Sequence, residues 1–140
     1  MTDNICEHIE QVCISLARDV GDSLQWSWDD RFRAALAQFS VDDKDSIHEL
    51  LARHFSAIWE SSNIAEAPDR VRKLCADYGG LRPGQLLFSS AAEQDAILLG
   101  LWWPWGNGKT ISIRILPIVI GLPESEIDEL LERFKTRFGC

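Results

Sequence analysis

The sequence predicts an α+β fold in which a helical layer packs on a three-stranded antiparallel sheet, with one more helix at the end. Apolar residues recur at helical spacing through residues 1–80 and again from residue 123, but they alternate with a period of two between residues 85 and 121. The expected order is therefore ααααβββα. No linker or repeat interrupts the 140 residues, so we expect one domain over 1–140, made of a helical layer (1–80), a β-meander (81–122) and a C-terminal helix (123–140).

Each predicted helix has a start signal of its own. Asp3 is a candidate cap for the first helix, which should end at Gly21, and Ser27 is a candidate cap for the second. The third is expected after Asp42 and the fourth from Pro68, a residue type favoured at a first helical position. Pro123 would open the last helix in the same way. The apolar stripe of the second helix is Trp28, Phe32, Leu36 and Phe39, and that of the third runs from Ile47 to Trp59.

The three strands are expected at about 85–90, 95–105 and 109–121, and the turns set their register. A three-residue loop with Gly108 in the left-handed conformation pairs Trp103 with Ile111. A two-residue Asn-Gly turn would pair Trp103 with Ser112 and mix apolar with polar side chains, so we predict the first register. The core face would then be Leu86, Phe88, Ile97, Leu99, Leu101, Trp103, Ile111, Ile113 and Ile115, and the opposite face would be Leu87, Ala96, Leu98, Gly100, Trp102, Ser112, Arg114 and Leu116.

The opposite face is too apolar for solvent and too polar for a core, which makes it the candidate contact surface. In the predicted register Arg114 leans towards the ring of Trp102, and such a stacked pair suits an interface better than a core without a carboxylate. An acidic stripe on the last helix would supply the rim. The predicted partner-binding residues are Leu87, Leu98, Trp102, Arg114, Leu116, Glu124, Asp128 and Glu132.

The net charge of −8 limits the classes of partner. Phosphate binding and anionic membrane surfaces require an excess of Lys and Arg, so we expect neither nucleic acid nor membrane as a partner. A protein, especially a basic one, or a second copy in a homodimer remains compatible. The start MTDNICEHIE lacks the features of a secretory signal, and the four cysteines (Cys6, Cys13, Cys75 and Cys140) are not spaced as a disulfide framework. Together these features predict reduced thiols and a cytoplasmic location.

No motif for catalysis, metal or cofactor binding emerges from the sequence. Gly108-Lys109-Thr110 lacks the upstream glycine and the following helix of a phosphate-binding loop. No cysteine and histidine spacing suits a metal, so we expect no metal and no cofactor. The carboxylates at Asp29-Asp30 are expected to cap helices rather than to transfer protons. The sequence leaves open whether the fold brings a histidine and a carboxylate together, such as His54 with Asp30.

The predicted function is a small protein–protein interaction module, such as an adaptor, a chaperone or an inhibitor of the immunity type. It would dock its partner through the mixed sheet face. The alternative is a small enzyme or ligand-binding domain whose site is assembled from residues that are distant in sequence. A cleft lined by Trp rings, a histidine and a carboxylate would favour the enzyme, and a shallow apolar patch would favour the interaction module.

Overall fold

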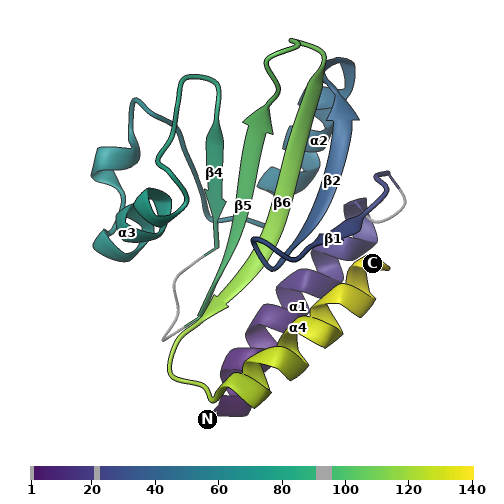
Figure 1. Cartoon of the computed structure of the whole chain (residues 1–140), viewed down its shortest axis with the longest axis vertical. Helices are drawn as coiled ribbons and strands as arrows, with labels where there is room; N and C mark the ends of the chain where they lie inside the picture. The colour runs from purple at the N-terminus through teal and green to yellow at the C-terminus, as the bar shows by residue number, and fades with distance from the viewer. Residues whose placement is uncertain (1, 21–22, 91–95) are drawn as a thin grey trace.

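The computed structural model describes residues 2–20, 23–90 and 96–140, and within the first helix it describes side chains from Glu10 onward (Figure 1). The predicted stop Gly21 and the side chains of Asp3, the predicted cap, and Cys6 lie outside the described part. The helices are α1 (Thr2–Val20), α2 (Lys44–Ala52), α3 (Asp69–Asp77) and α4 (Glu124–Phe138), with single 3₁₀ turns at Val41–Asp43 and Ile64–Glu66. The strands are β1 (Ser27–Asp29), β2 (Ala34–Ser40), β3 (Ala57–Trp59), β4 (Leu86–Ser89), β5 (Ala96–Pro104) and β6 (Thr110–Val119).

The fold is α+β, and its strands form one antiparallel sheet in the order β1-β2-β6-β5-β4-β3. The predicted meander is present as β4, β5 and β6, but the prediction of three strands is wrong because the first half adds three more. The observed order of helices and strands is αββαβαβββα, so the expected run of four helices is also wrong. Chain segments from both halves are therefore interleaved in one sheet.

The largest error lies at residues 27–40, where a β-hairpin replaces the predicted second helix. Asp29 caps no helix; instead its Oδ1 accepts hydrogen bonds from the backbone N–H groups of Arg31 (3.0 Å) and Phe32 (3.3 Å) and so stabilises the turn of the hairpin. The chain then reverses at Arg33, whose φ of 52° is left-handed, and returns as β2. The first half of strand β2, Ala34 to Ala37, is buried or half-buried on both faces, so its run of apolar residues resembles that of a buried helix.

The register of β5 and β6 is the one that the sequence argument rejected. Trp103 pairs with Ser112, and Trp102 pairs with Ile113. The loop has four residues, since Trp105 N–H donates to Thr110 O at 2.8 Å. The Asn107 side chain stabilises this loop by accepting hydrogen bonds from the N–H groups of Lys109 (2.8 Å) and Thr110 (3.1 Å). The loop length, which the alternation of side chains could not reveal, decided the register.

The register of β4 and β5 also differs, because Phe88 pairs with Gly100 and not with Ile97. An odd shift turns every side chain of a strand to the other face. Both register changes are odd, so the side chains of β5 lie on the opposite face, relative to β4 and to β6, from the one predicted. Face A carries Ala35, Ala37, Phe39, Phe88, Ala96, Leu98, Gly100, Trp102, Ile111, Ile113 and Ile115, and face B carries Ala34, Leu36, Gln38, Leu87, Ser89, Ile97, Leu99, Leu101, Trp103, Ser112, Arg114 and Leu116.

Helices cover the two faces unequally. Face A packs against α1, α2 and α4 in a cluster that includes Leu16, Leu51 and Phe134. Face B packs against α3 through Val71 and Cys75, and against other chain segments around that helix. In Figure 1, α2 lies behind the sheet, α1 and α4 run side by side, and α3 stands beside β4 at the far side from β2. Helix α3 therefore lies over the β3, β4 and β5 side of face B, and the cluster around it extends to Ala34 of β2 and Leu116 of β6.

The hairpin loop offers a direct test through two glycines. Gly108 has a φ of 69°, whereas Gly106 is not left-handed, and an added Cβ would meet nothing within 4 Å at either position. We expect Gly108→Val to lower the free energy of unfolding by about 1–3 kcal/mol through backbone strain alone. Gly106→Val should change it by less than about 0.5 kcal/mol. Chemical denaturation measures both, and equal losses would contradict this loop geometry.

Candidate functional site

The part of face B that α3 leaves uncovered is the candidate site, which we call the open half of face B. It lies over β2, β6 and the end of β5. Strand pairing sets Leu36 beside Arg114, and Gln38 beside Ser112 and then Trp103. Trp105 follows the end of β5, but its N–H still donates to Thr110 O, so the alternation continues and places Trp105 on the same side as Trp103. The open half consists of Leu36, Gln38, Ser40, Trp103, Trp105, Thr110, Ser112 and Arg114, of which Gln38, Ser40 and Trp105 are exposed and only Ser112 is buried.

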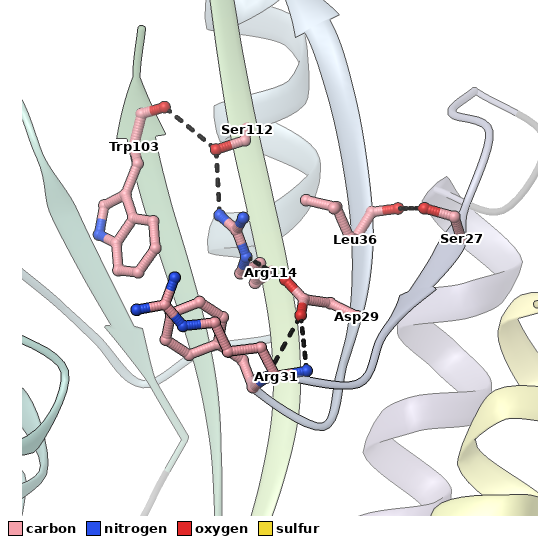
Figure 2. Close-up of polar contacts among 8 residues, drawn as sticks. Ser27, Asp29, Arg31, Leu36, Trp103, Ser112 and Arg114 are labelled. Atoms are coloured by element: carbon pink, nitrogen blue, oxygen red, sulfur yellow. Dashed lines mark hydrogen bonds and ion pairs between the residues drawn. The ribbon is translucent and has the colours of Figure 1, made fainter.

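Arg114 is the centre of this surface, and the side chains of Asp29 and Ser112 hold it by polar contacts (Figure 2). Its Nε donates to Asp29 Oδ2 at 2.8 Å, and its Nη1 donates to Ser112 Oγ at 3.3 Å. Ser112 Oγ in turn donates to the carbonyl oxygen of Trp103 at 3.3 Å. The side chains of Arg114 and Asp29 are only 17% and 13% exposed, so water screens this ion pair less than it screens a surface pair.

Two aromatic rings complete the contacts of the guanidinium. Arg114 Cζ lies 4.9 Å from the centre of the Trp103 ring and 5.1 Å from that of Phe32. The two rings meet edge to face, with centres 5.5 Å apart, and Phe32 also contacts Tyr78 beyond α3. Cation–π contacts strengthen when they are partly desolvated, as this one is. The result is an arginine whose planar head has little freedom to move.

Asp29 links the site to the turn of the first hairpin. Burial acts to raise the pKa of Asp29, but hydrogen bonds from Arg114 and from the backbone of Phe32 and Arg31, with the charge of Arg114, outweigh it and hold that pKa below its usual value. The carboxylate is therefore ionised at neutral pH. It fixes both the turn that presents Phe32 and the guanidinium that Phe32 covers.

The structure does not bring the predicted contact residues together on one surface. Leu87, Leu116 and Arg114 lie on face B, whereas Leu98 and Trp102 lie on face A. The four apolar residues are at most 5% exposed, because helices of the same chain cover them. Arg114 alone belongs to the open half, and it stacks on Trp103 instead of Trp102.

The acidic stripe lies elsewhere, on the exposed side of α4. Glu124 Oε1 lies 3.6 Å from Arg33 Nη2, and Glu132 Oε1 lies 3.6 Å from Lys135 Nζ, while Asp128 is exposed. Helix α4 packs on face A, so these carboxylates do not form a rim around Arg114. The predicted sheet residues and this acidic stripe therefore do not form one continuous surface.

Sequence reasoning missed Asp29, Phe32 and Trp103 as members of the site. The signal for Asp29 was present, because an arginine in an apolar strand needs a carboxylate when it is buried. Asp29 lies 85 residues away from Arg114 along the chain, and it was assigned to the cap of a helix that does not form. Phe32 was assigned to the same helix, and Trp103 was assigned to the core by the register error.

A histidine and a carboxylate do meet in the fold, but the carboxylate is Asp19 and not Asp30. His54 Nε2 lies 2.6 Å from Asp19 Oδ2, and this contact joins the end of α1 to the segment after α2. The thiols of Cys13, Cys75 and Cys140 are free, and Cys13 and Cys75 are buried. Burial, aided by Glu10, raises the pKa of Cys13 to about 12, so this thiol is protonated at neutral pH.

No family model, curated protein or solved structure matches this chain. Among the helices in the described part of the chain, none is long and apolar enough to cross a membrane. The class that the structure defines is an α+β domain built on one six-stranded antiparallel sheet, with an arginine clamped between two aromatic rings on its open half.

Proposed function

We propose that this domain is a protein–protein interaction module that docks its partner through the open half of face B. The observation that carries this proposal is the clamped Arg114 beside Trp103 and the exposed Trp105. Trp and Arg are the residue types that most often dominate binding energy at protein interfaces. Trp105 is 43% exposed although its ring is large and apolar. The corrected surface therefore keeps the chemistry of the predicted one, with different residues.

Rigidity supports the same proposal. Ordering a free arginine at an interface costs side-chain entropy, which lowers the affinity. Here Asp29, Ser112 and the two rings have already ordered Arg114 within the free chain. A partner would meet a preformed surface and would lose less entropy on binding.

The size of the open half requires help from its surroundings. Three strands about 4.8 Å apart and about five residues of about 3.3 Å each span roughly 200–300 Å². A stable complex buries about 800 Å² on each partner. The loop between Trp105 and Thr110 and the turn at residues 30–33, seen beside Arg114 in Figure 2, border the open half and would supply further contact area.

The enzyme alternative receives less support from the groups at hand. Asp29 is held ionised by Arg114, so it suits a structural anion better than a general acid. Cys13 and Cys75 are buried, with raised pKa values, and protonated thiols are weak nucleophiles. His54 and Asp19 join two elements far from the open half, on α1 and after α2.

The test uses Trp105 and Ile120, the two exposed large hydrophobic residues in the described part of the chain. The tagged chain is expressed in cells, and its co-purifying proteins are quantified by mass spectrometry. We expect Trp105→Glu to reduce the main partner at least tenfold, because a carboxylate opposes burial at an interface. Ile120 is 56% exposed and lies outside the open half, so the control variant Ile120→Glu should retain the main partner.

Two readouts make the result decisive. Circular dichroism must show that both variants fold, and sedimentation velocity reports whether the partner is a second copy. If Trp105→Glu and Ile120→Glu retain the same partners as the wild type, the open half of face B is not the docking surface.

A further inference from the structure

The outer edge of β2 extends beyond the strand that covers it. Strand β1 pairs only with Ala34, Leu36 and the residue between them, whereas β6 pairs with β2 as far as Ser40. Residues 37–40 therefore have a strand on one side only. An uncovered strand edge is a template for another strand, which folded proteins usually protect.

The hydrogen-bonding phase shows which backbone groups face outward. Val41 N–H donates to Lys109 O at 2.9 Å, across the β2–β6 pair. Residues two apart on a strand face the same neighbour, so Phe39 and Ala37 also face β6, and Gln38 and Ser40 face outward. The contact of Ser27 Oγ with Leu36 O at 3.4 Å, visible in Figure 2, agrees with this phase.

These outward groups are the N–H and C=O of Gln38 and the N–H of Ser40. In the residues that the structure describes, none of them has a backbone partner outside the β2–β6 ladder. An added strand would satisfy them with its own backbone, in the recognition mode known as β-augmentation.

A groove runs along this edge. It has a volume of about 660 Å³ and lies between the 23–25 segment and α2. A second hollow of about 240 Å³ lies on the other side of the edge, beside Ser27 and Leu36. The larger groove is lined by Ser23, Leu24, Gln25, Gln38, Phe39, Asp43, Ser46, Ile47 and Leu50. Alternate side chains of an added strand would thus enter two hollows, of which the larger has an apolar wall.

The charge around the groove determines which charge a bound peptide segment should carry. Residues 42–49 carry four carboxylates and one lysine, and the whole chain has a net charge of −8. Asp42, Asp43, Asp45 and Glu49 are all exposed; Asp43 lines the groove itself, and Glu49 is paired with Arg53 at 3.2 Å. A segment rich in Lys or Arg is attracted to this surface, and an acidic segment is repelled.

We propose that the edge of β2 at Gln38 binds an extended basic peptide segment, which adds to the sheet as a strand with apolar residues turned into the groove. The groove lies beside β2 and α2; it shares Gln38 with the open half of face B but includes none of Arg114, Trp103 and Trp105. The inference therefore goes beyond the proposed docking through the open half of face B and does not depend on it.

The experiment uses a fluorescein-labelled peptide of alternating lysine and valine, seven residues long with blocked ends, and measures fluorescence anisotropy. We expect saturable binding, and at least tenfold weaker binding when glutamate replaces lysine. Two further peptides carry N-methyl groups either on every lysine amide or on every valine amide. Only one of these two should lose binding tenfold, because one edge of an added strand is bonded and the other is free.

Variants of the chain complete the test. Gln38→Pro removes the outward N–H and should abolish peptide binding, while Gln38→Ala removes only the side chain and should retain it. Because the proline variant can fail to fold, amide exchange of the wild type gives an independent readout. The Gln38 N–H should exchange at least tenfold more slowly with unlabelled peptide present.

Each outcome decides the proposal. Absence of peptide binding, equal binding of both N-methylated peptides, or an unchanged exchange rate at Gln38 would overturn it. Trp105→Glu is expected to bind the peptide like the wild type. If the wild type binds the peptide but Trp105→Glu loses no partner, docking at the open half is refuted and the proposal for the β2 edge stands.

Discussion

Changing Trp102 to glutamate is expected to unfold the domain. The Trp102 side chain lies on face A, only 5% exposed, and its ring contacts those of Phe39, His48 and Phe88 at centre distances of 5.2–5.9 Å. Removing such a ring costs about 3–5 kcal/mol, and a buried carboxylate without a partner adds several more. The sum is comparable with the whole stability of a typical domain, about 5–15 kcal/mol. Loss of the far-UV circular dichroism signal and of the cooperative thermal transition measures the effect.

Trp105→Glu is the matched control for this change, since the same substitution is made three residues further along the hairpin. At 43% exposure the carboxylate at position 105 can stay in water, so the melting temperature should fall by only a few degrees. A folded Trp102→Glu variant with the melting temperature of the wild type would contradict the burial of Trp102. It would favour the register in which Trp102 faces outward.

The misplacement of Trp102 shows what periodicity can and cannot predict. Strands β4, β5 and β6 were predicted within two residues of their observed bounds, because a period of two is a property of each strand alone. Their pairing depends on loop length. The loop between Trp105 and Thr110 holds four residues that Asn107 organises, and neither the three-residue loop nor a clean sorting of side chains predicts this.

Burial on both faces explains why sorting by polarity failed. If one face were apolar and the other mixed, the register with the cleaner separation of apolar and polar side chains would be correct. In the structure α3 packs on face B, which places Leu87, Leu99 and Leu101 in a second core. When a sheet is covered on both sides, polarity no longer specifies the register.

The prediction of a helix at residues 27–40 was wrong for a related reason. The spacing of Trp28, Phe32 and Leu36 fits a helix, and alanines at 34, 35 and 37 favour one. Pairing of β2 with β6 overrides this preference. It also places Asp29 beside Arg114, a contact between segments that local patterns do not connect. Of the candidate site, the sequence therefore predicted an arginine stacked on a tryptophan, but neither the right tryptophan nor the carboxylate.

The ion pair of Asp29 and Arg114 should be a main stabiliser of the open half of face B. Asp29→Asn keeps the Oδ1 that accepts from Arg31 and Phe32, so it removes mainly the charge that faces Arg114. Arg114→Met keeps an unbranched stem against the rings but leaves Asp29 without its cation. We expect each change to lower the free energy of unfolding by about 2–3 kcal/mol, somewhat less than for fully buried pairs.

A double-mutant cycle separates the pair from its surroundings. If the two charges interact directly, the double variant should lose at least about 1 kcal/mol less than the sum of the single losses. Urea denaturation at neutral pH gives all four stabilities. Strictly additive losses would mean that the 2.8 Å contact contributes nothing beyond the packing of each side chain.

The pH dependence gives the same pair a signature that packing alone lacks. The contact with Arg114 and the two backbone N–H groups lower the pKa of Asp29 in the folded state below its ordinary value of 3.8. Its stabilisation is therefore complete above pH 3.8, and it is lost as the pH falls through the lower folded value. The gap in unfolding free energy between the wild type and Asp29→Asn should be constant from about pH 5 to 7 and should shrink below about pH 4. A gap that persists unchanged as far as the acid unfolding of both proteins would assign the effect of the substitution to lost packing and not to the charge of Asp29.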